Sequence, residues 1–358
     1  MDELEQKMRL LETIRSQEAE SFKVDEQGIL AAYKKRSANT SGLAIKILSI
    51  FGGILSALAF LGFLLILEIY DSSTAMLVVG LGFIAAAILI SNRFERLILD
   101  TFGVSLYVLG FILFVIALFS LDFHEDHIIF MVMVMALLTL FLVKNYVLSF
   151  ISVLTVAVSL LLFIISKDAY EAIHFYIIMY AVALTIFVLE EAALMALAPK
   201  LISLYDPLRI GLVFSLLIGL IALGKDGLIP VSKNTVWVSS IVSILLILYL
   251  IKRVLLDLEV KQKPRQYLIF LLTLATLLPT LFAPAIAGSL LIVLLSFKVN
   301  YRTGFVIGVL ALIYCIGQYY YDLNISLLTK SLLLFSSGVV FLVFYLFFNK
   351  KPGPNENV

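Results

Sequence analysis

The sequence predicts an all-α fold, a polytopic integral membrane helix bundle of about twelve transmembrane helices. Hydrophobic residues make up 62% of the 358 residues and charged residues 14%, whereas a soluble domain is about half apolar and about a quarter charged. The apolar residues come in blocks near the roughly 20 residues that a helix needs to cross a bilayer. Lys and Arg residues concentrate in alternate connections between these blocks. Lipid is therefore expected to surround most of the helices.

The apolar blocks, taken in order, define the expected spans. The shorter blocks fit a bilayer that thins locally or a span whose flanking side chains snorkel to the interface. The spans are residues 44–67, 74–90, 102–121, 127–143, 147–165, 173–189, 208–223, 234–251, 267–282, 285–297, 304–321 and 331–348.

The distribution of basic residues predicts the orientation. Of the 26 Lys and Arg residues, all but Lys167, Lys225, Lys233 and Lys330 fall in one of the two alternating sets of connections. Basic residues close to span ends resist translocation, so the richer set is expected in the cytoplasm. This places both termini there, in a bacterial cytoplasmic (inner) membrane. A single miscounted span would destroy the bias.

One pair of blocks allows two interpretations. The blocks 267–282 and 285–297 are short, and Pro279 and Pro284 lie in or beside them. An apolar run of this length forms a re-entrant segment as readily as a span. Two spans are favoured, because prolines are tolerated where neighbouring helices satisfy the freed backbone groups. A re-entrant hairpin would leave the predicted orientation of the segments before and after it unchanged.

Three regions are expected along the chain. Residues 1–43 form a cytoplasmic helical N-terminal arm that packs on the protein's own inner surface or binds a partner helix, residues 44–348 form the transmembrane bundle, and residues 349–358 form a cytoplasmic tail. Segments 84–100 and 241–257 align without gaps. This alignment raises the hypothesis of two duplicated halves, 44–198 and 208–348.

Glu190 and Glu191 are candidate functional residues on the cytoplasmic side. Two alternatives follow from their place after an apolar run. The helix continues to Pro199 and carries both carboxylates into the inner part of the bilayer, where Arg209 or Lys200 could pair with one of them. Otherwise the span ends at Leu189 and an interfacial helix follows. At least one of the two glutamates is hypothesised to be functional, since carboxylates at membrane depth are otherwise costly.

The rest of the chain offers no motif for catalysis, a cofactor or a metal. The span interiors carry almost no ionisable groups, which counts against ion coupling through buried carboxylates. The segment 122–127 contains two histidines and three acids but lacks the spacing of a metal site, and is expected to be a hydrated connector. The single cysteine, Cys315, is expected to be a buried apolar residue. No basic domain supports nucleic-acid binding.

The segment 319–331 is the most distinctive stretch of the chain. Tyr320, Tyr321 and Asp322 are followed by Lys330 and Ser331, and the tyrosines suit an outer interfacial belt while Lys330 snorkels and pairs with Asp322. The pattern Tyr-Tyr-x-Leu, Leu-Leu-x-Lys-Ser resembles the end of an uncharacterised bacterial polytopic membrane-protein family, the domain of unknown function four-four-zero-one. That resemblance implies a membrane bundle and no particular activity.

These observations favour an integral membrane protein without enzymatic activity, with a scaffolding role in the envelope or a lipid-related role, and with membrane lipids as partners. The alternative is a secondary transporter of a small or lipid-like solute, built from two halves. A polar cavity at the midplane between the halves favours the transporter, and a solidly packed bundle favours the scaffold. A membrane-embedded enzyme needs carboxylates or histidines that converge at one interface, and none are expected to do so.

Overall fold

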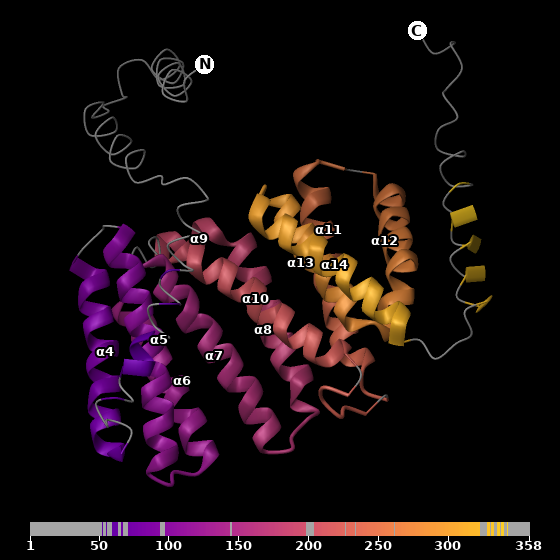
Figure 1. Cartoon of the computed structure of the whole chain (residues 1–358). Coiled ribbons are helices and arrows are strands. Elements are labelled where there is room, and N and C mark those ends of the chain that lie inside the picture. The colour runs from indigo at the N-terminus through magenta and orange to yellow at the C-terminus, as the bar shows by residue number, and fades with distance from the viewer. Residues whose placement is uncertain are drawn as a thin grey trace, which may run out of the picture.

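The computed structural model describes residues 71–93, 97–143, 145–197, 204–225, 227–232, 234–260 and 262–322, with scattered positions between 52 and 66 and between 328 and 342. Within these residues the secondary structure is helical and contains no strand, which confirms the all-α prediction. The principal helices, in chain order, are α4 (Ser73–Arg93), α5 (Leu97–Ser120), α6 (Glu125–Leu142), α7 (Tyr146–Ser166), α8 (Ala172–Leu189), α9 (Glu191–Leu197), α10 (Tyr205–Gly224), α11 (Trp237–Asp257), α12 (Lys263–Leu277), the 3₁₀ helix η4 (Leu278–Phe282), α13 (Pro284–Lys298) and α14 (Arg302–Asp322) (Figure 1).

Nine helices in the described part of the chain are long and apolar enough to cross a membrane, and the shorter α13 is also apolar. At a rise of about 1.5 Å per residue, their lengths fit the hydrocarbon core of a bilayer. They coincide with ten of the expected spans, those from 74–90 to 304–321. The first expected span, 44–67, and the last, 331–348, lie mostly outside the described residues, as do the arm 1–43 and the tail 349–358. The full number of crossings therefore stays a prediction.

Short, capped connections reverse the chain between neighbouring helices. Asn145 caps α7, and its side-chain oxygen accepts hydrogen bonds from the backbone N–H groups of Val147 (2.9 Å) and Leu148 (3.3 Å). Such a cap satisfies donors that a helix N-terminus leaves unpaired. Asp122 and Asp168 adopt positive φ angles of 59° and 52° in the connections after α5 and α7. Tight reversals of this kind place successive helices side by side.

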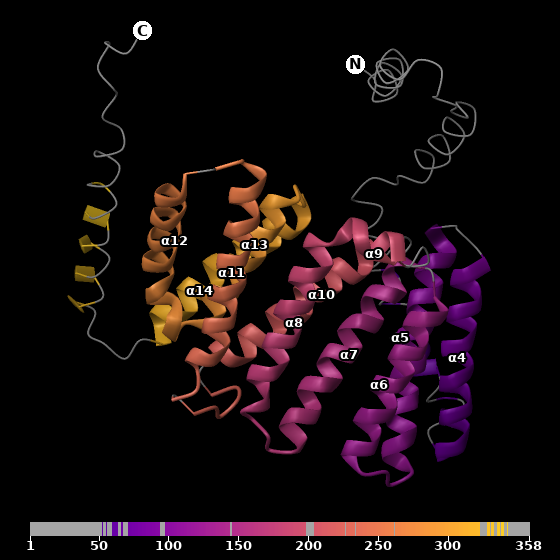
Figure 2. The same ribbon diagram turned by 180° about the vertical axis from the view of Figure 1, so that it is seen from behind.

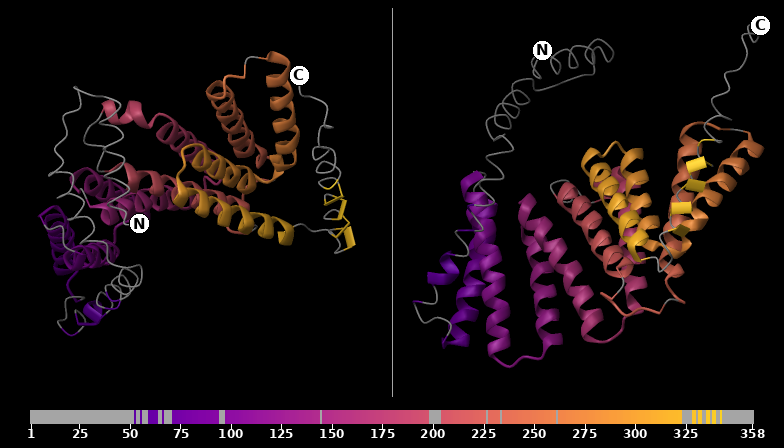
Figure 3. Two further views of the ribbon diagram at one scale, coloured as in Figure 1. Left: turned by 90° about the horizontal axis from the view of Figure 1, so that it is seen from above. Right: turned by 45° about the vertical axis from the view of Figure 1, so that its right-hand side comes forward.

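The helices run from α4 at one edge of the molecule to α12 at the opposite edge (Figures 1 and 2). The right-hand view of Figure 3 shows that chain order is not kept throughout the row, because α13 and α14 lie before α12. Two clusters of buried apolar side chains lie along this row. One includes Ile84, Tyr107 and Leu148 of α4, α5 and α7, and the other joins α8, α10, α11, α13 and α14 around residues such as Leu220 and Leu291. The helix α7 packs against both.

Polar contacts at the helix ends follow the predicted alternation. At the predicted outer end, Lys167 after α7 pairs with Asp126 at the start of α6. At the predicted inner end, Lys298 at the end of α13 pairs with Asp257 at the end of α11, and Asn92 of α4 donates a 2.8 Å hydrogen bond to the carbonyl of Leu142. Each contact joins ends that the sequence places on the same side, as expected for helices that cross in alternate directions.

The segment of uncertain topology forms two helices joined by a tight corner. Pro279 lies in η4, and Pro284 is the first residue of α13, a position where the missing N–H of proline costs nothing. The corner at Ala283 lies beside the last turn of α10 and the last turn of α14, where the three segments line one cavity. These three ends share the predicted outer side, and the choice between two crossings and a re-entrant hairpin stays a prediction.

Candidate functional site

The predicted pair Glu190 and Glu191 marks a break between two helices. Helix α8 ends at Leu189, Glu190 caps it with φ −106° and ψ 31°, and the seven-residue helix α9 begins at Glu191. Of the two alternatives, the span that ends at Leu189 and is followed by a short helix is therefore correct, and the continuous helix to Pro199 is wrong. The break directs the two carboxylates to different neighbours.

Glu190 forms an ion pair with Arg253 of α11. The Nε and Nη2 atoms of Arg253 also donate to the hydroxyl of Tyr249, at 3.0 Å and 2.8 Å. Both charged side chains are about two-fifths exposed, at 40% for Glu190 and 41% for Arg253. The contact is therefore a solvent-accessible tie between α8 and α11 and not a buried charge.

Glu191 accepts a 3.0 Å hydrogen bond from the hydroxyl of Tyr205 at the start of α10. The Tyr205 ring stacks on Phe187 with centroids 4.8 Å apart and an interplanar angle of 12°. Arg209, one of the two cations expected to pair with the glutamates, instead pairs with Asp206 at 2.7 Å and lies 3.9 Å above the ring of Tyr301. The expected pairing with Arg209 is therefore wrong, and Lys200 lies outside the described residues.

Together these contacts form what we call the inner clasp, made of Glu190, Glu191, Tyr205, Arg209 and Arg253. The clasp ties α8, α9, α10 and α11 at one end of the bundle. Sequence reasoning missed Arg253, although it lies in a connection predicted on the same side as Glu190. The arrangement brings together no three acidic, histidine or cysteine groups able to hold a metal ion, and none occurs elsewhere in the described part of the chain.

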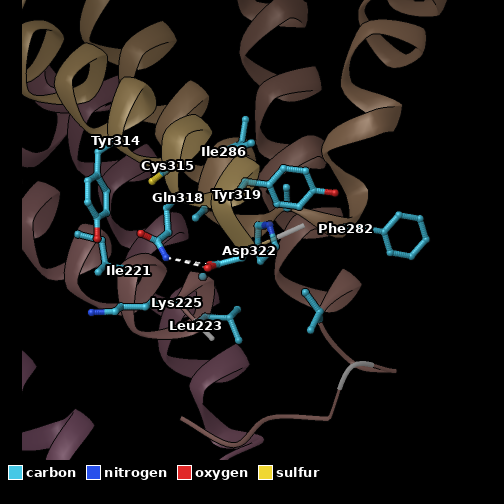
Figure 4. A pocket seen from close by; sticks show the side chains of 15 residues that line it. Ile221, Leu223, Lys225, Phe282, Ile286, Tyr314, Cys315, Gln318, Tyr319 and Asp322 are labelled. Atoms are coloured by element: carbon cyan, nitrogen blue, oxygen red, sulfur yellow. Dashed lines mark hydrogen bonds between the residues drawn. The ribbon is translucent and has the colours of Figure 1, made fainter. Parts of the chain in front are cut away.

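A cavity of about 350 Å³ lies at the opposite, predicted outer end of the same group of helices. It opens between the last turn of α10, the corner before α13 and the last turns of α14 (Figure 4). We call it the outer pocket. It is lined by Ile221, Leu223, Gly224, Lys225, Val236, Phe282, Ala283, Pro284, Ala285, Ile286, Tyr314, Cys315, Gln318, Tyr319 and Asp322.

The outer pocket combines apolar walls with a few polar groups. Both carboxylate oxygens of Asp322 accept hydrogen bonds from the Gln318 amide one turn earlier, at 3.0 Å and 2.9 Å. Cys315 is only 3% exposed, and its sulfur lies 3.6 Å from the Ser289 hydroxyl. The amine of Lys225 points away from Asp322 (Figure 4). Within the described residues these two opposite charges form no ion pair with each other.

Only part of the predicted C-terminal motif belongs to the outer pocket. Asp322 lines the pocket, whereas Tyr321 is 80% exposed and contacts Tyr320 edge-on with centroids 6.0 Å apart. The Ser331 hydroxyl donates to the carbonyl of Leu328 at 3.0 Å. Lys330 lies outside the described residues, so its contact with Asp322 stays a prediction.

Several pocket residues were not identified from the sequence. Lys225 is one of the four basic residues in the sparsely charged set of connections, and this position was its only signal. Gln318 is an amide at the end of an otherwise apolar helix face. Cys315 was correctly expected to be buried. Their proximity comes from the packing of α10, α13 and α14, which no local pattern shows.

A second polar group joins α8 to the segment before α11 at the predicted outer end. Glu171 accepts hydrogen bonds from the Thr235 hydroxyl at 2.7 Å and from the Ser232 N–H at 3.1 Å. These two donors, with the hydroxyl the larger effect, lower the pKa of Glu171. Beside it, Nδ1 of the buried His174 lies 2.8 Å from the Ser239 hydroxyl. This group fixes the connection that borders the outer pocket at Val236.

Comparison with known proteins supplies a family and no activity. The family model described as Domain of unknown function (DUF4401) matches residues 42–351. No curated protein and no solved structure shows significant similarity to the chain. The match covers the whole described bundle, including the inner clasp and the outer pocket. The chain therefore belongs to the DUF4401 family.

Proposed function

We propose that the protein is a non-enzymatic protein of the bacterial inner membrane, with both termini cytoplasmic, whose lipid-related role is to hold an amphipathic, lipid-like molecule in the outer pocket. The observation that carries this proposal is the pocket itself. It is an apolar cavity at the end of the bundle, bordered by an unpaired acid and base in the described part of the chain.

The size and composition of the outer pocket fit such a molecule. Cavities of about 300–1,000 Å³ with mostly apolar walls and a few polar groups are typical ligand sites. Here Ile221 and Ile286 supply apolar surface, and Asp322 and Gln318 supply the polar edge. The ends of membrane helices lie at the depth of lipid headgroups. An acyl chain and a polar group on one molecule therefore match the two kinds of wall.

A pocket-filling substitution tests the proposal. Ile286→Trp enlarges a side chain that lines the pocket, whereas Ile313→Trp places the same side chain on the exposed surface of α14, where Ile313 is 64% exposed. We expect the first variant to retain less lipid after purification in detergent, as measured by mass spectrometry of the intact protein, and the second to retain as much as the wild type. Equal lipid retention by the two variants would remove the proposal.

A secondary transporter is the second candidate, favoured by one observation. The outer pocket lies at the end of α10 and beside the start of α11, while the inner clasp ties these same helices at their other ends. A carrier that is open on one side has this arrangement. However, the pocket lies among α10, α13 and α14 and not at the midplane between the expected halves. This position favours binding over transport.

A transbilayer assay separates the two candidates. The protein is reconstituted in liposomes that contain a lipid with a fluorescent acyl chain, and the fraction of fluorescence that external dithionite bleaches is measured. Under the first proposal we expect only the outer leaflet, about half of the signal, to be bleached. Bleaching of the inner-leaflet lipid that depends on the outer-pocket residues would instead establish the carrier.

A further inference from the structure

We infer that the ligand of the outer pocket is a zwitterionic phospholipid with a primary ammonium group, whose ammonium is held by Asp322 and whose phosphate is held by Lys225. This inference rests on the proposed function and names its ligand class. The two charges stand at one opening, on α14 and at the end of α10, and they do not neutralise each other within the described residues.

The carboxylate of Asp322 is prepared for a cation. Its two oxygens accept from one amide, that of Gln318, which orients the group and brings no opposite charge, and no cation among the described residues pairs with it. A carboxylate has about four lone-pair sites, so acceptor capacity remains for an ammonium group. Hydrogen bonds in which both the donor and the acceptor are charged are among the stronger polar contacts.

Two tyrosines add to the recognition of a cation. Tyr314 and Tyr319 both line the outer pocket and remain partly exposed, at 46% and 37%. Aromatic rings attract a cation placed over their faces. Tyr319 lies on the same helix as Asp322 and less than one turn before it. Both rings therefore border the pocket in which an ammonium group at Asp322 would lie.

Lys225 lies at the opposite side of the opening. It caps the C-terminus of α10, and its side chain contributes to the pocket wall while its amine points outward. A lysine amine is a point charge on a flexible four-carbon stem and binds phosphate without demanding one geometry. A phosphate between the acyl chains and the ammonium group fits this position.

The apolar wall decides between a lipid and a soluble zwitterion. Phe282 and Ile286, on either side of the α12–α13 corner, both line the outer pocket, and the ring of Phe282 points outward from it (Figure 4). Phe282 is itself 66% exposed, so the wall continues onto the lipid-facing surface. A soluble headgroup would leave this wall in contact with water, whereas an acyl chain covers it. A lipid with only negative charge would meet Lys225 but be repelled by Asp322.

The native thiol of Cys315 provides the measurement. It is the only cysteine of the chain and lies in the pocket wall, so a ligand in the pocket should slow its alkylation by a small neutral maleimide. The full chain in detergent is titrated with phosphatidylethanolamine, with phosphatidylglycerol, or with soluble phosphoethanolamine. We expect phosphatidylethanolamine to protect Cys315 at concentrations about tenfold lower than phosphatidylglycerol, because phosphatidylglycerol lacks one charge-assisted contact. Soluble phosphoethanolamine should give no protection.

Two variants assign the headgroup contacts. Asp322→Asn should remove the preference for phosphatidylethanolamine, and Lys225→Gln should weaken protection by both phospholipids. The control Asp122→Asn removes an acid from another predicted outer connection, far from the pocket. Asp122 has a φ of 59°, which asparagine also tolerates. This control should behave as wild type. Unfolding temperatures of all variants are compared, and the wild-type comparison among lipids does not depend on any variant folding.

The remaining outcomes are distinguishable. Equal protection by the two phospholipids, unchanged in Asp322→Asn, overturns the headgroup inference but leaves the proposed lipid binding intact. Stronger protection by phosphatidylglycerol also overturns the inference. Protection by phosphoethanolamine alone shows that the ligand is a soluble zwitterion. If no lipid protects Cys315 and no lipid is retained, the proposed function fails together with the inference.

Discussion

At the scale of single residues, the polar groups of this bundle differ in how much they are compensated. Glu190 and Glu191 looked alike in the sequence but have different partners, Arg253 and the hydroxyl of Tyr205. Asp322 has only the Gln318 amide within the described residues. An uncompensated acid beside a cavity is a stronger candidate for ligand binding than a paired acid at an exposed helix end.

The contacts of the inner clasp should contribute unequally to stability. Glu190→Gln and Arg253→Gln break an ion pair that is about two-fifths exposed, so each should lower the free energy of unfolding only slightly. Tyr205 is 3% exposed, and its hydroxyl donates to the Glu191 carboxylate and the Phe187 carbonyl. Tyr205→Phe should lower the free energy of unfolding by about 1 kcal/mol or more, because both acceptors lose their donor. Denaturant unfolding of the three variants in the same detergent measures these losses. A larger loss for Glu190→Gln than for Tyr205→Phe would contradict the ranking.

The hypothesis that a glutamate of the clasp is functional requires a separate measurement. The double variant Glu190→Gln and Glu191→Gln keeps the shape of both side chains and removes both charges. If either carboxylate is needed for function, the variant should fail to complement a strain that lacks the gene while it accumulates normally in the membrane. Full complementation would remove the hypothesis.

Glu171 should make the connection before α11 sensitive to acid. Its lowered pKa means that its hydrogen bonds to Thr235 and Ser232 stabilise the fold above the ordinary glutamate pKa. This stabilisation is lost as the pH falls through the lower pKa of the folded state. Trp237, the only tryptophan of the chain, lies two residues beyond Thr235. We expect its fluorescence to change below about pH 4 in the wild type. The same transition in Glu171→Gln would show that another group causes it.

At the scale of helices, the sequence located small residues but not their partners. Gly211, Ser215 and Gly219 stand at four-residue spacing on α10 and pack closely, because a Cβ atom on Gly219 would lie 2.5 Å from the Tyr176 ring. The close contact between Gly80 of α4 and Gly110 of α5, which is made with backbone atoms, was not identified. The spacing of small residues along one helix can be read from the sequence. A contact between single glycines on two helices depends on the relative axial position of those helices, which the sequence does not show. Small residues allow this close approach in membranes.

Substitution of Gly110 should separate α4 from α5. A Cβ atom there would lie 2.7 Å from the backbone oxygen of Gly80 and 2.9 Å from the backbone nitrogen of Ile84. Backbone atoms cannot move aside as a flexible side chain can, so Gly110→Ala should destabilise the protein by about 1–3 kcal/mol. Gly82→Ala on α4 meets nothing within 4 Å and is the matched control. Equal unfolding temperatures for the two variants would contradict the close contact.

Helix ends illustrate what local sequence can and cannot predict. Ten expected spans match helices in the described residues, because apolar length alone determines them. The end of α8 at Leu189 was left between two alternatives, since Ala192 to Ala198 is also apolar and favours a longer helix. What distinguishes the two alternatives is tertiary, because with α8 ending there Glu190 and Glu191 each contact a partner on another helix.

At the scale of the whole molecule, the candidate site was less predictable than the fold. Asp322 was singled out, but the outer pocket also needs Lys225 and the corner at Ala283, which are widely separated in the sequence. Charge alternation does place all three at outer helix ends, so it predicts that they share a side. It does not predict that α10, α13 and α14 converge. Convergence depends on side-chain packing, which one sequence without its structure does not show.

The orientation of the bundle is the last property that the sequence predicts and that experiment should decide. Asn234 lies at the predicted outer end and Lys263 at the predicted cytoplasmic end, and both are exposed. In a Cys315→Ala background, Asn234→Cys should react with a membrane-impermeant maleimide in intact cells, whereas Lys263→Cys should react only after permeabilisation. The physical reason is the excess of basic residues around Lys263, which resist translocation. The opposite labelling pattern would invert the bundle and place the outer pocket in the cytoplasmic leaflet.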